Sequence, residues 1–86
     1  MPRLSEFYGI VIYMYWQDHR PAHFHAIYGE YEALVRIDDG SFLRGDLPRA
    51  ARRLVDEWLD LHRDELLANW QRAQVLEPLL PIEPLQ

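Results

Sequence analysis

The hydrophobic pattern of this chain changes its period at Asp46-Leu47-Pro48, and this change restricts the fold more than any other feature. Before it, short β-branched and aromatic runs are separated by turn residues. After it, apolar residues recur every three or four positions, which predicts an amphipathic helix. Asp46 is a candidate N-cap, and Pro48 suits the first turn because its missing N–H costs nothing there. The sequence predicts helical structure from about residues 48 to 74, as one long helix or two short ones separated near His62.

The segments before the helix predict an antiparallel sheet within residues 8–44. Gly29-Glu30 separates two alternating runs by two residues, which is typical of a hairpin. Four runs have strand composition, at residues 8–16, 23–28, 31–37 and 42–44. Short turns between consecutive strands give a meander of three or four strands, covered by the helical stripe. The expected fold class is therefore α+β, and we expect four helical side chains to be largely buried: Leu54, Trp58, Leu61 and Trp70.

The last residues, 75–86, differ from the rest of the chain. Pro78, Pro81 and Pro84 recur every third residue, which is the period of polyproline II. This predicts an extended tail that lies along the domain, or alternatively a segment that docks on a partner. With strands, helical region and tail together, the 86 residues are expected to form a single domain, 1–86.

The cysteine content, the apolar runs and the net charge exclude several classes of protein. The chain has no cysteine, which excludes disulfides, thiolate nucleophiles and cysteine-bound zinc. No signal-peptide pattern begins the chain and no apolar run approaches the roughly 20 residues of a membrane span, so a cytoplasmic protein without membrane contact is expected. A net charge of −5 argues against coating nucleic acid by bulk electrostatics, although all nine basic residues are arginine, which favours bidentate phosphate contacts. Because the chain is small, a partner or homodimer formation would add stability.

Three of the four histidines lie within seven residues: His19, His23 and His25. If residues 23–28 form a strand, His23 and His25 project from one face, about 6–7 Å apart. The turn at Pro21 can fold His19 back over them. Histidine titrates near neutral pH and often ligates metals. Together with Arg20, the cluster could therefore be a catalytic acid–base pair, a phosphate clamp or part of a metal site.

These alternatives differ in what else they require. A metal site needs at least a third ligand, for which the local candidates are His19, Asp18, Glu30 and Glu32. Because His-x-His alone is weak evidence for a metal, we predict metal-free chemistry and no cofactor. The predicted catalytic residues are His23, His25, His19 and Arg20. The competing interpretation is that both rings are structural and hydrogen-bond across the sheet.

Three further residues are candidates for an auxiliary role. His62 and Glu65 lie one helical turn apart, so the carboxylate could fix the orientation of the imidazole. An ordinary polar helix face near a helix break explains the same pair. Arg36 is a second candidate, after Arg20, for steadying phosphate charge.

Two segments resemble a known bacterial family. Residues 2–15 and the segment Asp18-His19-Arg20-Pro21-Ala22-His23-Phe24-His25-Ala26 closely resemble the family called domain of unknown function 4160, with Ala22 where a second proline is common. The resemblance implies a small partner protein encoded nearby, the two forming a toxin–antitoxin pair in which some relatives are described as the toxin. It implies no established chemistry.

Two functions of different classes follow. The first is a toxin-like component acting on RNA, as a metal-independent ribonuclease whose histidines supply the base and acid. The second is a non-catalytic binding module, an antitoxin or co-regulator, that works with the partner protein and uses its aromatic sheet face and tail as an interface.

Overall fold

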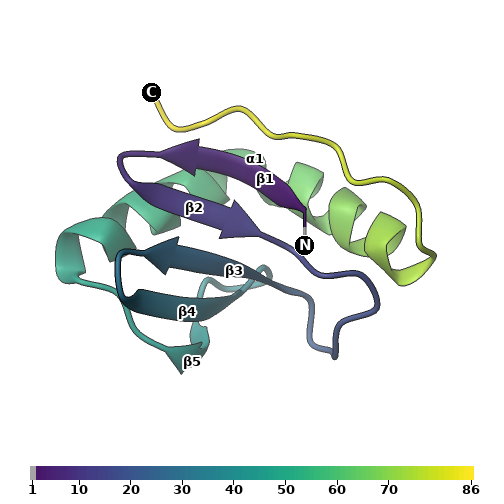
Figure 1. The fold of residues 1–86 in the computed structure, drawn as a ribbon, viewed down its shortest axis with the longest axis horizontal. Coiled ribbons are helices and arrows are strands. Elements are labelled where there is room, and N and C mark those ends of the chain that lie inside the picture. The colour runs from purple at the N-terminus through teal and green to yellow at the C-terminus, as the bar shows by residue number, and fades with distance from the viewer. Residues whose placement is uncertain (1) are drawn as a thin grey trace.

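The computed structural model describes residues 2–86 and consists of a five-stranded sheet followed by one long helix (Figure 1). The elements are β1 Arg3–Phe7, β2 Ile10–Tyr13, β3 His23–Tyr28, β4 Tyr31–Arg36, β5 Phe42–Gly45 and α1 Arg49–Gln74. Each strand pairs antiparallel with the next, so the strands follow one another across the sheet in chain order. The predicted α+β architecture is confirmed.

The predicted number of strands, three or four, is wrong because a further strand, β1, precedes residue 8, whereas residues 8–16 contain only β2. β1 and β2 form a hairpin whose two turn residues, Tyr8 and Gly9, both have positive φ, 51° and 81°. Positive φ at both positions matches the twist of a two-residue hairpin. β1 buries Leu4 and Phe7. Its polar residues between these two break the simple apolar–polar alternation that would have marked it as a strand.

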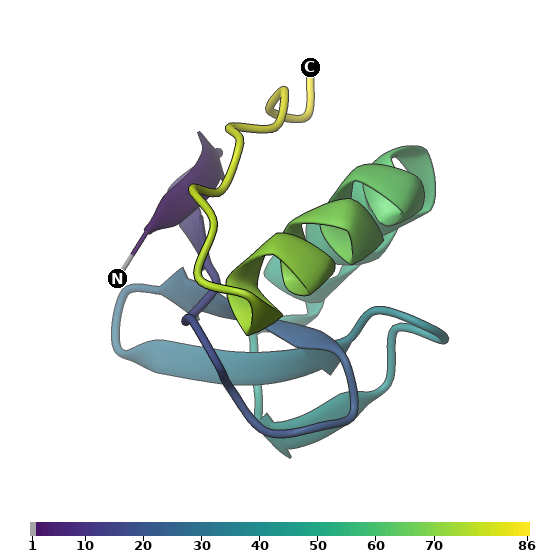
Figure 2. The same ribbon diagram turned by 90° about the vertical axis from the view of Figure 1, so that its right-hand side faces the viewer.

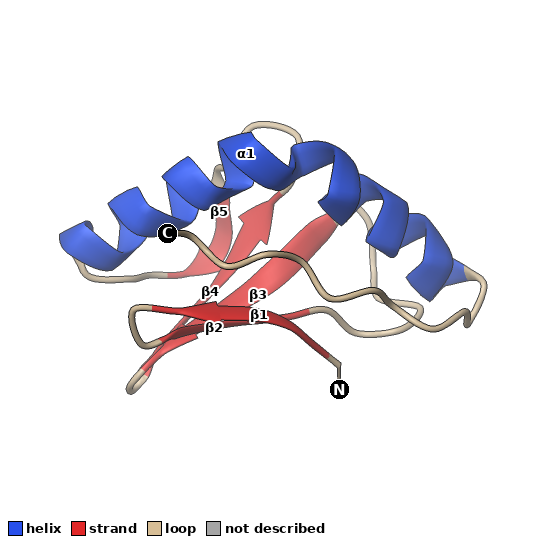
Figure 3. Cartoon of the chain, turned by 90° about the horizontal axis from the view of Figure 1, so that it is seen from above, coloured by secondary structure: helices blue, strands red, loops and turns tan. Residues whose placement is uncertain are grey.

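One face of the sheet and α1 enclose the hydrophobic core. Figures 2 and 3 show α1 crossing a single face of the sheet. Trp58 is fully buried there, with its ring centroid 5.3 Å from that of Phe7 and 5.7 Å from that of Phe24. The other fully buried side chains of the sheet include Ile10, Ile12, Ala26, Ala33 and Val35. Residues that face the core recur every second position in a strand and about every 3.6 positions in a helix. The packing of α1 on the sheet therefore accounts for the change in the period of the apolar residues along the chain.

The helix is continuous in sequence but kinked at His62, whose φ and ψ of −126° and 22° are not helical. It begins at Arg49, and Asp46 does not cap it: the Asp46 carboxylate accepts a hydrogen bond from the adjacent Leu47 N–H. Trp58 and Trp70 are buried as predicted, whereas Leu54 is only half-buried.

The prediction for Leu61 is wrong, because 67% of this side chain is exposed. The helix turns toward the sheet the face that carries Val55, Trp58, Leu59 and Leu66, all of which are buried. Leu61 lies just before the kink, two residues after the buried Leu59 and therefore about 200° around the helix from it. An apolar residue on the surface is unremarkable by itself.

The C-terminal segment lies beside β1 without forming helix or strand (Figure 1). Ile82 is buried and its N–H donates to the Leu4 carbonyl oxygen at 2.8 Å. The Trp58 indole N–H donates to the Glu83 carbonyl oxygen, also at 2.8 Å. The segment therefore covers the β1 edge of the sheet, and its polyproline II conformation stays a prediction.

The second face of the sheet carries the histidines. Side chains alternate along a strand, so His23 and His25 point away from the face that holds Phe24. Strand register places Arg36 opposite His23 and Leu34 opposite His25. Among the described residues 2–86, no helix combines the length and apolarity that crossing a membrane would require.

Candidate functional site

The segment between β2 and β3 brings a carboxylate over the two histidines. Met14 is fully buried, the Gln17 N–H donates to the Ala73 carbonyl oxygen at 3.1 Å, and the Trp16 indole donates to the Glu77 carbonyl oxygen at 3.0 Å. These contacts tie the segment to the end of α1. The next residue, Asp18, is thereby held above β3.

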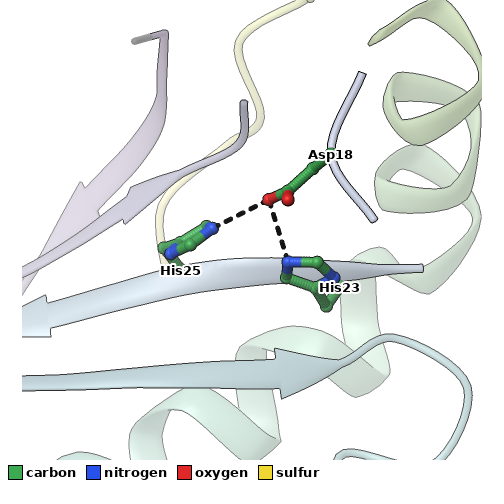
Figure 4. Close-up of side chains that lie close together, drawn as sticks. All are labelled: Asp18, His23 and His25. Carbon is green, nitrogen blue, oxygen red and sulfur yellow. Dashed lines mark hydrogen bonds and ion pairs between the residues drawn. The ribbon is translucent and has the colours of Figure 1, made fainter. Parts of the chain in front are cut away.

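Asp18, His23 and His25 converge on one point (Figure 4). One oxygen, Asp18 Oδ2, lies 3.0 Å from His23 Nε2 and 3.2 Å from His25 Nε2. The second carboxylate oxygen, Oδ1, accepts the His19 backbone N–H at 2.8 Å. The carboxylate is thus oriented from both ends. We call these three residues the Asp18–His23–His25 cluster.

Neighbouring groups fix both imidazole rings. His23 Nδ1 lies 2.8 Å from the Pro21 carbonyl oxygen, and its ring packs at 5.3 Å on Trp70. His25 Nδ1 lies 3.2 Å from a Glu32 carboxylate oxygen, and Tyr15 packs edge-on at 4.4 Å from its ring. Each ring therefore has one nitrogen held by a fixed partner and the other aimed at Asp18.

The electrostatics keep Asp18 ionised. Burial raises the pKa of this carboxyl, but hydrogen bonds from the His25 ring and the His19 amide, and then the charge of both imidazoles, lower it by more. The result is a pKa below the ordinary aspartate value. The stability that Asp18 contributes through these contacts is present above the pKa of an aspartate in the unfolded chain and is lost only as the pH falls through the lower folded-state pKa.

A cleft of about 650 Å³ opens beside the cluster. Its walls include the exposed side chains of His19, Arg20 and Arg44, which come from the loop after β2 and from β5. Glu32 and Tyr15 line it as well. Two guanidinium groups, three imidazoles and two carboxylates therefore border one cavity of a size typical of small-molecule sites.

The structure thus brings four predicted residues to one site: His19, Arg20, His23 and His25. It places the auxiliary candidates elsewhere. His62 Nδ1 lies 2.6 Å from Glu65 Oε1, and its ring packs on Trp58 at the helix kink, outside the cleft. Arg36, although opposite His23, reaches toward Asp38 at 3.8 Å and does not line the cleft.

Sequence reasoning missed how central Asp18 is, since it was considered only as one of several metal ligands. It also missed Arg44, because β5 reaches the site only through the register of the sheet. Both histidines are nearly buried, with exposed fractions of 4% and 7%. Burial and hydrogen bonding match the structural interpretation of these rings, but their shared carboxylate partner and the adjoining cleft favour a functional site.

Comparison with known proteins yields one family. A family described as "Domain of unknown function (DUF4160)" matches residues 9–71. No curated protein and no solved structure matches the chain. The matched segment contains β2 to β5 and most of α1, and with them every residue of the Asp18–His23–His25 cluster. Since it covers more than half of the chain, this protein belongs to the family of domain of unknown function DUF4160.

Proposed function

We propose that this protein is the toxin-like component of a bacterial two-protein module and cleaves RNA in the cytoplasm, at the cleft beside the Asp18–His23–His25 cluster. The observation that carries the proposal is the meeting of this cluster with Arg20 and Arg44 around one cavity. Cleaving a phosphodiester needs a group that takes a proton from the attacking oxygen and cations that neutralise the phosphate.

The two requirements map onto different residues. Arg20 and Arg44 are exposed at the cleft. Each guanidinium group can donate two parallel hydrogen bonds to two oxygens of one phosphate. The cluster would activate the attacking oxygen. Because the net charge is −5, RNA affinity has to come from these local contacts rather than from the overall field of the protein.

The alternative, a non-catalytic binding module, is supported by the free edge of the sheet. In residues 2–86, β1 is covered by the C-terminal segment, whereas β5 pairs only with β4. A partner strand could add to that edge through backbone hydrogen bonds. It would lie beside Leu43 and Arg44, which line the cleft, so a small partner protein bound there would also cover the site of a toxin.

Expression in a bacterial host separates the two functions. The protein alone should arrest growth, and co-expression with the protein encoded beside it should relieve the arrest. His25→Ala should abolish the arrest at an equal soluble level, because it removes a cluster residue. His62→Ala is the matched control and should remain toxic, since His62 lies outside the cleft.

Unimpaired growth with the wild-type protein would reject the toxin role and favour the binding module. Equal toxicity of His25→Ala and wild type would place the active surface elsewhere on the molecule.

A further inference from the structure

The partners of the two buried histidines require more positive charge than two neutral rings carry. His23 Nδ1 faces the Pro21 carbonyl oxygen at 2.8 Å, and His25 Nδ1 faces the Glu32 carboxylate at 3.2 Å. A carbonyl or ionised carboxylate only accepts hydrogen bonds, so each Nδ1 has to carry the hydrogen. A neutral imidazole has one N–H. While the rings are neutral, both Nε2 atoms therefore present lone pairs.

Both lone pairs face a third acceptor. Asp18 Oδ2 lies 3.0 Å from His23 Nε2 and 3.2 Å from His25 Nε2. Electron-rich atoms this close repel one another unless positive charge lies among them. Two additional protons, one on each ring, would supply it, and so would a single divalent metal ion. His23 and His25 are only 4% and 7% exposed. Two imidazolium ions in this position would therefore cost free energy, because each charge is removed from water.

We infer that the cluster binds one divalent transition-metal ion, through the Nε2 atoms of His23 and His25 and through Asp18 Oδ2. The ligand spacing agrees, because one ligand atom from each residue lies within 4.8 Å of the other two. Ligands bonded to zinc at about 2.1 Å lie about 3.4 Å apart at a tetrahedral angle. Small side-chain movements bring the three atoms to that spacing.

The remaining contacts are those of metal-binding histidines. Such a histidine usually donates its second N–H to a carboxylate or a backbone carbonyl, which fixes the ring. Pro21 does this for His23, and Glu32 does it for His25. Glu32 is therefore a positioning residue. Two imidazoles with one carboxylate suit zinc or ferrous iron, and three protein ligands leave a position open to the cleft.

With a metal ion bound, the chemistry of the cleft would differ from the metal-free chemistry expected from the sequence. A catalytic role of the metal rests on the proposed function, since the metal would act in the same cleft. Binding of the metal rests on the geometry of the three ligands alone. The two are therefore tested by separate measurements.

Zinc titration of the purified, chelator-treated full chain, followed by calorimetry, tests the binding. Wild type should take up one equivalent. Glu32→Gln should weaken affinity by roughly 10–100-fold, the usual effect of losing a partner of a ligand, and Asp18→Asn and His25→Ala should weaken it further. His62→Ala should bind like wild type. Thermal unfolding of each variant shows whether it is folded, and zinc-dependent shifts of the ring nitrogens of His23 and His25 in the wild type give a readout that needs no variant.

The outcomes separate the proposals. Failure of wild type to bind zinc, Mn²⁺ and Fe²⁺, or unchanged zinc affinity in folded Asp18→Asn, overturns the metal site, and leaves the rings as paired imidazolium ions. RNA cleavage that persists in excess chelator overturns the catalytic role of the metal while preserving the proposed function. Zinc uptake without RNA cleavage overturns the proposed function while preserving the site.

Discussion

Trp58→Ala should leave the protein unfolded, or close to unfolded, at room temperature. Trp58 is fully buried, packs on Phe7 and Phe24, and ties the C-terminal segment to the helix through Glu83. Removing a buried tryptophan costs about 3–5 kcal/mol, and native domains are stable by only about 5–15 kcal/mol in total. The loss of a cooperative urea transition, followed by circular dichroism, is the measurement.

Two controls accompany this prediction. Leu61→Ala should change stability by less than about 0.5 kcal/mol, because that side chain is 67% exposed. Trp58→Phe should remain folded but lose the bond to Glu83, which contributes about 1 kcal/mol. A Trp58→Ala protein that melts within a few degrees of wild type would contradict the packing of α1 on the sheet.

Gly45→Ala should be the second most damaging change. Gly45 has a φ of +77°, and a Cβ at this position would overlap the Glu32 backbone carbonyl oxygen on β4. We expect a loss of about 3 kcal/mol or more, because both the left-handed conformation and the overlap have to be relieved by moving β5. Glu32 and Arg44 both line the cleft, so the same change should also impair the site.

Gly29→Ala is the matched control, since Gly29 has a φ of +59° but no atom within 4 Å of an added Cβ. It carries only the conformational cost of about 1–2 kcal/mol. Comparing the urea midpoints of the two variants isolates the overlap. Equal losses would show that β5 does not press on β4 as described.

Periodicity predicts most of the fold because most elements are simple amphipathic repeats. The alternation over residues 23–28 and the turn at Gly29 identify the β3–β4 hairpin, in which Tyr28 pairs with Tyr31. β1 escapes prediction because its burial does not alternate strictly. The exposure of Leu61 escapes it as well, since a spacing of three residues from the buried Trp58 does not show how wide the buried face of the helix is.

The site is only half predictable for a related reason. A spacing of two residues places His23 and His25 on one face of any strand. The position of Asp18 depends instead on contacts between the loop after β2 and the end of α1, such as Gln17 with Ala73. Contacts between residues this far apart in sequence leave no local pattern.

Cleavage of single-stranded RNA by wild type and by Asp18→Asn, at equal concentration and with equal melting temperatures, tests whether the Asp18–His23–His25 cluster cleaves RNA. Asp18→Asn keeps the shape of the side chain but removes the charge that both imidazoles face. We expect cleavage by wild type and a decrease of about 100-fold or more in the variant, the usual scale when acid–base assistance is lost, because the cluster depends on the Asp18 charge. Asp38→Asn, on an exposed residue outside the cleft, should cleave like wild type. RNA left intact by the wild type would reject RNA cleavage as the function, and equal cleavage by folded Asp18→Asn would show that the Asp18–His23–His25 cluster does not carry it out.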